Sequence, residues 1–348
     1  MEFSGQASES APIGLTHSLI LPQDTSSRTK MNTVITGGTG FVRAELSSTL
    51  IHRGERPIVF DVTQIRGSLA GLSDRFEYVR GSVANLSELA NAFSQRKVDR
   101  IFHLGGMLSL PSEQNPWQAF DVNAVGTYNV LESARIFRVR QVIFSSSIAV
   151  YTEDHSEDEV TETTCCHPAT IYGTCKVFGE LLGRYYARRF GLDFRAVRLP
   201  SVVGPFSTVS HMSSYNCWAI EEPLKGRPYA VPVEPETKVP AIYFKDAARA
   251  LLLLAEAEKS KLSGTTYNIA GIKPVYSAGQ LVQAVQREVP QADLSFAPDA
   301  HIMSLVAGLT QTRINDDRAH RDWGWAVKYG LDEMVKDFIH EFHSHGPL

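Results

Sequence analysis

The stretch MNTVITGGTGFVRAELSSTLIHR, residues 31–53, decides the fold of this chain. Its first six residues form a short apolar and β-branched run, which predicts a strand. A glycine-rich turn, Thr36-Gly37-Gly38-Thr39-Gly40-Phe41, follows directly. From residue 41 to residue 53 the apolar residues recur at helical spacing. A strand, a glycine turn and a helix in this order are the context that a dinucleotide-binding fingerprint requires.

The chemistry of this turn follows from its glycines. Glycine lets the backbone approach a pyrophosphate closely, and the next helix offers free N–H groups and the positive end of its dipole. The next predicted strand, Pro57-Ile58-Val59-Phe60-Asp61, ends in an acid about 20 residues after the glycines. A carboxylate at that place can accept hydrogen bonds from both ribose hydroxyls and would repel a 2′-phosphate. Asp61 therefore favours NAD over NADP.

Strand and helix signals keep alternating as far as residue 199. Further strands are expected at 76–79, 101–104, 141–145 and 194–199, and helices at 85–96, 115–138 and 169–190. This alternation predicts an α/β fold, a Rossmann-type doubly wound parallel sheet with helices on both faces. Ligands of such sheets bind beyond the carboxyl ends of the strands. The residues expected at those ends are Gly37, Asp61, Leu104-Gly105-Gly106 and Ser145-Ser146-Ser147.

A serine-rich strand end and a Tyr-x-x-x-Lys motif supply candidate catalytic groups. Tyr172 and Lys176 are four residues apart on a predicted helix, so they share one face. A free tyrosine has a pKa of about 10, and a nearby cation is expected to lower it. Lys176 is also expected to reach the nicotinamide ribose. Ser146 or Ser147 can hydrogen-bond the reacting oxygen while Tyr172 takes the hydroxyl proton and hydride leaves the same carbon.

The two ends of the chain differ from its centre. Residues 1–30 are rich in Ser, Thr, Gln and Pro without periodicity, which predicts a flexible leader. Residues 31–200 are expected to form the NAD-binding Rossmann domain. After residue 200 the alternation loosens, which predicts a small mixed α/β substrate-binding lobe, residues 201–348. Within it we expect helices at 214–225, 246–258, 277–287 and 331–343, and a strand returning at 266–269.

Composition narrows the class of function. Of 348 residues, 43% are hydrophobic and 21% are charged, which is typical of a soluble globular protein. A net charge of -4 gives no electrostatic footprint for nucleic acid or for an anionic membrane. No apolar run approaches the roughly 20 residues that span a bilayer. The four cysteines lack a metal-ligand spacing and are interpreted as reduced thiols of a cytoplasmic protein, so no metal site is expected.

Taken together, these motifs resemble the extended short-chain dehydrogenase/reductase family over residues 31–345. The glycine turn, Asp61 and the Tyr-x-x-x-Lys motif carry the resemblance, together with HLGG (103–106), NAVGT (123–127), SSSIAVY (145–151) and RLP (198–200). It implies NAD as the cofactor. The residues that it implies for NAD binding are Gly37, Gly38, Thr39, Gly40, Phe41, Val42, Asp61, Ser82, Val83, Leu104, Gly105, Gly106, Asn123, Ser145, Tyr172, Lys176, Leu199, Pro200 and Val202.

Within that family the chain is most similar to the short-chain L-threonine 3-dehydrogenases. Four stretches carry this likeness: HLGGMLSLPSEQNP (103–116), SSIAV (146–150), VPAIYFKDAARA (239–250) and DWGW (322–325). It implies hydride transfer between a small β-hydroxy (amino) acid, or its ketone, and the nicotinamide. The resemblance to the extended short-chain family also implies a homodimer formed through the two long helices at 115–138 and 169–190, as a four-helix bundle. The residues implied for substrate contact are Ser109, Ser147, Tyr172, Ser201, Met212, Ser213 and Ser214.

Three departures from the family pattern bear on function. Arg43 stands where the third glycine of G-x-x-G-x-x-G is expected, and its long side chain is predicted to point outward, toward phosphate. Ser82 replaces an acid at the end of the third strand. The substrate-side loop reads Met212-Ser213-Ser214-Tyr215 where the threonine dehydrogenases carry Thr-Thr-Asp-Tyr, so the reception of an ammonium group is expected to differ. Beside this loop, His211 is a candidate contact.

Two other functions stay open. A sugar-nucleotide epimerase or dehydratase would retain NAD and form no net NADH. The short connection between Pro200 and Met212 argues against a UDP pocket, as does the proline in VPAIYFKDAARA where such enzymes place an Arg-Asp pair. An NAD-binding sensor is the non-enzymatic alternative, and the intact Ser, Tyr and Lys set argues against it.

Overall fold

A seven-stranded parallel sheet organises the chain. The computed structural model describes residues 31–37, 40–63, 70–152, 159–207, 211–310 and 312–345, so the predicted leader lies outside the described residues. The sheet has the order β11-β7-β5-β4-β1-β2-β3. Its strands are β1 (Thr33–Thr36), β2 (Ile58–Asp61), β3 (Glu77–Arg80), β4 (Arg100–His103), β5 (Gln141–Ser147), β7 (Asp193–Leu199) and β11 (Thr266–Asn268).

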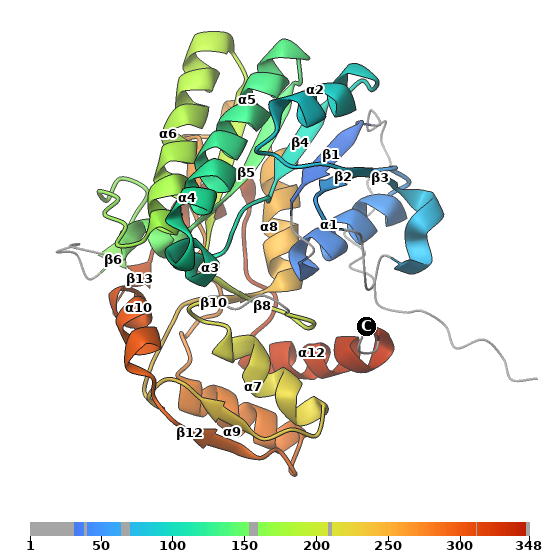
Figure 1. The fold of residues 1–348 in the computed structure, drawn as a ribbon. Coiled ribbons are helices and arrows are strands. Elements are labelled where there is room, and N and C mark those ends of the chain that lie inside the picture. Colours follow the sequence, from blue (N-terminus) through green and yellow to red (C-terminus); the bar gives the residue numbers. More distant parts are fainter. Residues whose placement is uncertain are drawn as a thin grey trace, which may run out of the picture. The chain divides into compact units, whose positions relative to one another are not determined.

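Helices cover both faces of this sheet (Figure 1). One face packs against α2 (Leu86–Ser94), α5 (Gly126–Ile136) and α6 (Ile171–Phe190), and the other against α1 (Phe41–His52) and α8 (Phe244–Glu256). The strands read as apolar runs because they are buried on both faces. The predicted doubly wound α/β fold is confirmed.

The strand order reverses at β1. The chain proceeds from β1 to β2 and β3 on one side, and then crosses to β4, β5 and β7 on the other. In open parallel sheets this switch point is where the loops after two neighbouring strands diverge and leave room for a ligand. The loops after β1 and β4 therefore define the edge at which a bound molecule is expected.

The long helix predicted at 115–138 is interrupted. It consists of α4 (Pro116–Ala119), a π-helical segment η2 (Phe120–Val125) and α5, and a separate helix α3 (Ser109–Gln114) precedes it. Helical phase is nearly continuous across a π segment, so the apolar spacing still reads as one helix. The sequence patterns also did not predict α10 (Ala300–Thr310), α11 (Asp317–Trp323), or the short strands β6 (Glu159–Val160), β8 (Ser201–Val203), β10 (Ala241–Tyr243), β12 (Leu294–Phe296) and β13 (Arg313–Ile314).

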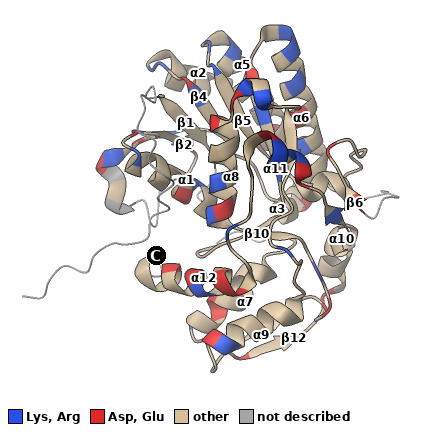
Figure 2. Ribbon diagram, turned by 180° about the vertical axis from the view of Figure 1, so that it is seen from behind, with Lys and Arg blue, Asp and Glu red and all other residues tan. Residues whose placement is uncertain are grey.

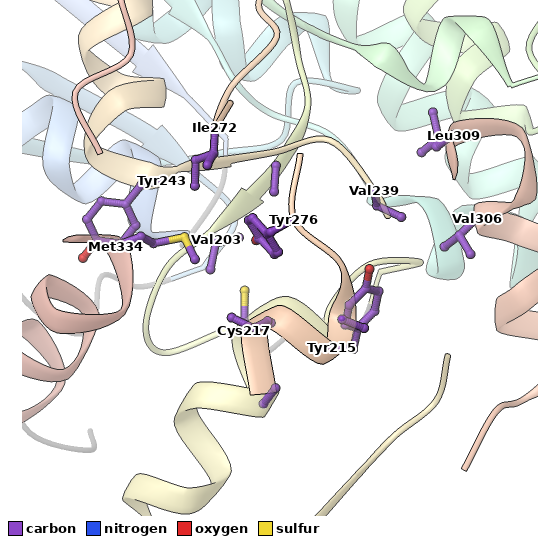
Figure 3. Packing of buried hydrophobic residues seen from close by; sticks show 14 of the residues in the cluster. Val203, Tyr215, Cys217, Val239, Tyr243, Ile272, Tyr276, Val306, Leu309 and Met334 are labelled. Carbon is purple, nitrogen blue, oxygen red and sulfur yellow. The ribbon is translucent and has the colours of Figure 1, made fainter. Parts of the chain in front are cut away.

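The C-terminal part adds a second core beyond the carboxyl edge of the sheet. Its elements are α7 (Tyr215–Leu224), α9 (Ala278–Glu288), α12 (Leu331–His345) and the parallel pair of β9 (Tyr229–Val231) and β12. Figure 3 shows buried side chains of this core, among them Tyr215 of α7, Met334 of α12 and Tyr276 just before α9. As expected, the strand near residue 266 returns to the main sheet and pairs with β7.

The surface and the cysteines carry few special features. Residues of both signs lie along α11 and α12 (Figure 2). Among the described residues, no helix has the length and apolarity needed to cross a membrane. No group of three or more His, Cys, Asp or Glu side chains in that same part of the chain is placed to hold a metal ion. All four cysteines are unpaired thiols.

Candidate active site at the carboxyl edge of the sheet

The glycine turn after β1 lies against the loop after β4. Gly37 has a positive φ of 68°, and a Cβ built on it would meet the Cα of Gly105 at 1.7 Å. Both positions therefore require glycine. Gly40 begins α1 without a side-chain cap, and a Cβ there would meet nothing within 4 Å. Among the described residues, no side chain therefore caps the N–H groups of the first turn of α1, which suits the binding of a pyrophosphate. Gly38 and Thr39 lie outside the described residues.

Arg43 does not point outward, so that prediction was wrong. Its side chain is 2% exposed and its Nη1 donates a 2.8 Å hydrogen bond to Oδ2 of Asp61, which is 3% exposed. The opposite carboxylate oxygen accepts the backbone N–H of Thr63 at 3.0 Å. An arginine can enter here because the buried acid at the end of β2 supplies its counter-charge. The Nε of Arg43 has no hydrogen-bond partner among the described residues.

A carboxylate contacts the end of β3, although the residue at the position where the family carries an acid, Ser82, is a serine. The backbone N–H of Ser82 donates a 2.7 Å hydrogen bond to Oε2 of Glu88, from the first turn of α2. Val83 is buried, and its carbonyl accepts the side-chain amide of Asn129 at 3.0 Å. Sequence reasoning missed Glu88 because it lies six residues after Ser82, and no motif relates these two positions.

The side chain of Asn123 fixes the loop after β4. Its Oδ1 accepts the backbone N–H of Met107 at 2.7 Å, and its Nδ2 donates to the carbonyl of the same residue at 3.1 Å. This residue belongs to the π segment η2, which places it against Gly106. Its carbonyl accepts a 2.6 Å hydrogen bond from the Thr127 hydroxyl. Leu104 and Gly105 complete this loop beside the glycine turn.

The three serines at the end of β5 have different environments. Ser145 offers its carbonyl to the Lys176 ammonium at 2.7 Å. Ser146 is 2% exposed and donates a 2.5 Å hydrogen bond to Oε1 of Glu180. Both hydroxyls thus lie near α6, but Ser146 is bound to Glu180 in the middle of the helix, whereas Ser147 is hydrogen-bonded to Tyr172 at its start. The prediction that either serine can reach the reacting oxygen therefore narrows to Ser147, which also caps the following turn at Ala149.

Tyr172 and Lys176 come together in the first two turns of α6. The Lys176 Nζ lies 5.4 Å from the centre of the Tyr172 ring, and a Cβ on Gly106 would lie 3.9 Å from the same Nζ. Burial raises the pKa of Tyr172 to about 12, although a hydrogen bond with Ser147 opposes this rise. Burial lowers the pKa of Lys176 to about 8. The expected net lowering of the tyrosine pKa was thus wrong, because desolvation outweighs the hydrogen bond with Ser147.

A buried ion pair between Arg198 and Glu180 lies next to the serine-rich end of β5. Arg198 at the end of β7 contacts Glu180 through two hydrogen bonds, Nε to Oε1 at 2.9 Å and Nη2 to Oε2 at 2.6 Å. Arg198 also donates to the hydroxyl of Tyr151, which itself donates to the carbonyl of Thr161 at 2.7 Å. Sequence reasoning missed Glu180 as a partner of Ser146. Its spacing of four residues from Lys176 was the available signal.

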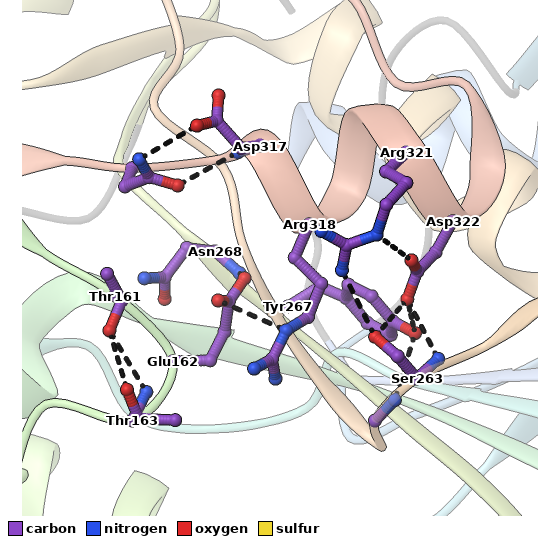
Figure 4. A network of polar contacts seen from close by, with 12 residues as sticks. Thr161, Glu162, Thr163, Ser263, Tyr267, Asn268, Asp317, Arg318, Arg321 and Asp322 are labelled. Atoms are coloured by element: carbon purple, nitrogen blue, oxygen red, sulfur yellow. Dashed lines mark hydrogen bonds and ion pairs between the residues drawn. The ribbon is translucent and has the colours of Figure 1, made fainter.

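The chain before α6 is anchored by a second polar network (Figure 4). Glu162 accepts the backbone N–H of Asn268 at 3.0 Å and pairs with Arg318 at 3.5 Å. Beside it, Asp322 accepts hydrogen bonds from the backbone and the hydroxyl of Ser263. These contacts connect the segment after β6 to β11 and α11. The segment that leads into α6, the helix of Tyr172, is therefore fixed by contacts with the C-terminal part of the chain.

The residues predicted for substrate contact gather at this same edge. The hydroxyl of Ser109, at the start of α3, accepts the backbone N–H of Met212 at 3.3 Å. The hydroxyls of Ser201 and Ser213 lie 2.6 Å apart. The hydroxyl of Ser214 accepts the backbone N–H of His211 at 2.6 Å, and burial lowers the pKa of this histidine to about 4, so its ring is neutral at pH 7.

The last residues predicted for the cofactor lie around the switch point. Phe41 packs edge to face against Phe244 with ring centres 5.9 Å apart. Leu199 and Pro200 are buried at the end of β7. The partly buried side chains of Val42 and Val202 pack against the core on that side of the sheet. The fold therefore brings the described candidates for cofactor binding and those for substrate contact to the same edge of the sheet.

The fold and this edge define a dinucleotide-binding enzyme of the Rossmann class. The sequence model of the "NAD dependent epimerase/dehydratase family" matches residues 33–270. A mitochondrial L-threonine 3-dehydrogenase of Bos taurus is 29% identical over 313 residues, covering 89% of this chain and 82% of that protein. The chain belongs to the NAD dependent epimerase/dehydratase family.

Solved structures agree with this assignment. The crystal structure of L-threonine dehydrogenase from Phytophthora infestans matches with a TM-score of 0.80 and 31% identity, over 90% of this chain and 99% of that chain. The holo form of a GalE-like L-threonine dehydrogenase from Cupriavidus necator matches with a TM-score of 0.81 and 28% identity, over 89% and 99%. These likenesses confirm the family resemblance, the enzyme class and NAD as the cofactor.

Proposed function

We propose that this protein is an NAD-dependent dehydrogenase of L-threonine or a closely related small β-hydroxy acid. The observation that carries the proposal is the convergence of Ser147, Tyr172 and Lys176 beside the loops of Gly37 and Gly105. The likeness to proteins described as L-threonine 3-dehydrogenases supports the substrate class.

The geometry fits NAD at the switch point. The uncapped first turn of α1 would hold the pyrophosphate, Asp61 the adenosine ribose and Lys176 the nicotinamide ribose. The cofactor supplies the hydride acceptor. Ser147 is placed to orient the substrate hydroxyl by a hydrogen bond, and Tyr172 is placed to take its proton.

We further propose that the substrate side recognises an uncharged or anionic group through hydroxyls. Ser109, Ser201 and Ser213 supply these hydroxyls, and His211 is neutral because its pKa lies at about 4. With serines on the substrate side, this protein would hold its substrate through hydrogen bonds rather than through the charge of a nearby carboxylate. A screen of NADH formation with small β-hydroxy acids, with and without an amino group, measures this preference.

A homodimer is the proposed assembly. Large apolar side chains are exposed along one group of helices, α4, η2, α5 and α6, a surface that a monomer rarely leaves uncovered. The exposed side chains are Trp117, Phe120, Tyr128, Phe178, Leu181 and Tyr185.

We also propose a cytoplasmic location, in keeping with unpaired cysteines.

The substitution Tyr172→Phe tests the proposed function. It removes the proton acceptor and keeps the ring, so turnover should fall by at least about 10²-fold, the usual scale for loss of a general base. Tyr185→Phe, at an exposed tyrosine of the same helix, is the matched control and should leave turnover unchanged. Turnover of the Tyr172→Phe protein close to wild type would reject the assignment.

The same assay separates the epimerase alternative. An NAD-retaining epimerase would convert its substrate without accumulating NADH, whereas a dehydrogenase forms one NADH for each alcohol oxidised. Stoichiometric NADH formation supports the proposal, and turnover without it contradicts the proposal.

A further inference from the structure

The end of β2 has an unusual charge arrangement. A lone carboxylate at this position accepts ribose hydroxyls and repels a 2′-phosphate. Here Asp61 is already paired with Arg43, and both side chains are almost fully buried. The carboxylate is therefore neutralised within the protein at the place where its negative charge would otherwise exclude a phosphate.

A second cationic residue, Arg80, lies on the neighbouring strand β3. Arg80 is the register partner of Asp61 in the β2–β3 pair. Side chains two residues apart on a strand share a face, so Arg80 is on the same face as Tyr78. The Tyr78 hydroxyl donates to the carbonyls of Asp61 and Thr63, at 3.0 and 2.8 Å, which places this face at the end of β2. Arg80 and Asp61 thus occupy paired positions at the ends of β3 and β2, and the charges of Asp61, Arg80 and Arg43 all act on the Tyr78 hydroxyl between them.

The guanidinium of Arg43 retains unused donor capacity. Nη1 is bound to Asp61, while the buried Nε has no partner among the described residues. An unpaired buried donor costs free energy unless a ligand or a water satisfies it. Arginine presents its donors in a planar fork that suits phosphate oxygens.

We propose that Arg43, with Arg80, makes the adenosine end of this site accept a 2′-phosphate, so that the protein binds NADP(H) as well as NAD(H). This inference rests on the proposed function, since it concerns the same nucleotide site. The position of Arg43 in the first turn of α1 places its charge between the pyrophosphate cradle and the ribose acid.

Calorimetric titration of the full chain with NAD⁺ and with NADP⁺ tests the proposal. We expect the wild-type dissociation constants for the two nucleotides to lie within about 10-fold of each other, since one charge-assisted contact offsets a repulsion of similar size. Arg43→Met keeps the length and burial of the side chain and removes the charge. It should raise the ratio of the NADP⁺ to the NAD⁺ dissociation constant by about 10-fold or more.

Two further variants and two further measurements guard against a merely structural effect. Arg43→Lys keeps a positive charge and should preserve most NADP⁺ binding, and Arg80→Gln should raise the same ratio without touching the buried pair. Circular dichroism establishes that each variant is folded. Raising the ionic strength should weaken NADP⁺ binding more than NAD⁺ binding, because the extra phosphate adds a screened interaction.

The outcomes separate this inference from the proposed function. Wild-type protein that binds NAD⁺ and discriminates against NADP⁺ by more than about 100-fold overturns only the inference. An unchanged ratio in both Arg43→Met and Arg80→Gln overturns it as well. Wild-type protein that binds neither nucleotide overturns the inference and the dehydrogenase proposal together.

Discussion

Tyr172 and Lys176 share a desolvated environment that disfavours both of their charged forms. Burial raises the pKa of the phenol to about 12 and lowers that of the ammonium to about 8. A phenolate next to an ammonium relieves both penalties at once, since each ion supplies the other's counter-charge. The Lys176 ammonium, 5.4 Å from the centre of the Tyr172 ring, is near enough to stabilise a phenolate that forms during the reaction.

The pH dependence of alcohol oxidation follows from the raised pKa of Tyr172. Oxidation needs Tyr172 without its proton, and the buried phenol holds that proton more tightly than a free one. The rate of oxidation should therefore keep rising with pH through about pH 8, while ketone reduction, which needs the proton that the phenol retains, should stay nearly constant over the same range. Initial rates in both directions across pH 6–10 measure this.

A companion variant checks that the lysine controls this profile. Lys176→Met removes the counter-charge, so the rising limb should move to higher pH and the maximal rate should fall. An oxidation rate that peaks below pH 7 and declines above it would be inconsistent with Tyr172 as the base.

At the scale of single residues, motifs predicted position better than orientation. Gly37, Gly105, Asp61, Tyr172 and Lys176 occur where the sequence placed them. The direction of Arg43 could not be inferred, because it depends on the buried acid of another strand. Nor could Ser146 be separated from Ser147, since that choice depends on which hydroxyl is bound by Glu180 and which by Tyr172.

Helix α6 lies close to the sheet because two of its glycines face aromatic rings. A Cβ on Gly179 would meet the Phe144 ring at 2.7 Å, and one on Gly183 would meet the Phe194 ring at 2.2 Å. The helix that carries Tyr172 thereby approaches β5 and β7 more closely than larger side chains would permit. Its glycine C-cap, Gly191, ends it with a φ of 73°.

The substitution Gly183→Ala should destabilise the protein although alanine is the better helix former. The new methyl group overlaps the ring of Phe194, and overpacking of a dense core costs about 1–3 kcal/mol. Urea unfolding measures the loss. Arg184→Ala, at the next and exposed position, is the control and should change stability by less than about 0.5 kcal/mol. Equal stability of Gly183→Ala and wild type would show that α6 can shift without cost.

At the scale of elements, long periodic segments were predicted well and short ones were not. The seven strands of the central sheet and helices α1, α2, α6, α7, α8, α9 and α12 all correspond to expected segments. The missed strands of the C-terminal part are two or three residues long, too short for an alternation to be recognised. Helix α10 was missed because its apolar residues do not form a single stripe.

An exposed apolar face on the paired helices α5 and α6 points to an association between whole molecules. The side chain of Leu181 is 56% exposed and lies on this face, so Leu181→Glu should convert the proposed dimer into a monomer. Sedimentation equilibrium at several concentrations measures the change.

An exposed leucine elsewhere provides the control for that experiment. Leu86 begins α2 and is 38% exposed, and Leu86→Glu should leave the association state unchanged. A wild-type chain that sediments as a monomer would contradict the proposed assembly directly.

The strand that completes the sheet is contributed late. β11 pairs with β7, yet 66 residues separate the end of β7 from the start of β11. On the ribosome, the open edge of β7 therefore waits for its neighbour until most of the C-terminal half has been synthesised. An unpaired parallel edge is prone to mispairing with other chains. Nonsense mutations and early translational arrest should thus yield aggregation-prone fragments rather than a soluble nucleotide-binding module.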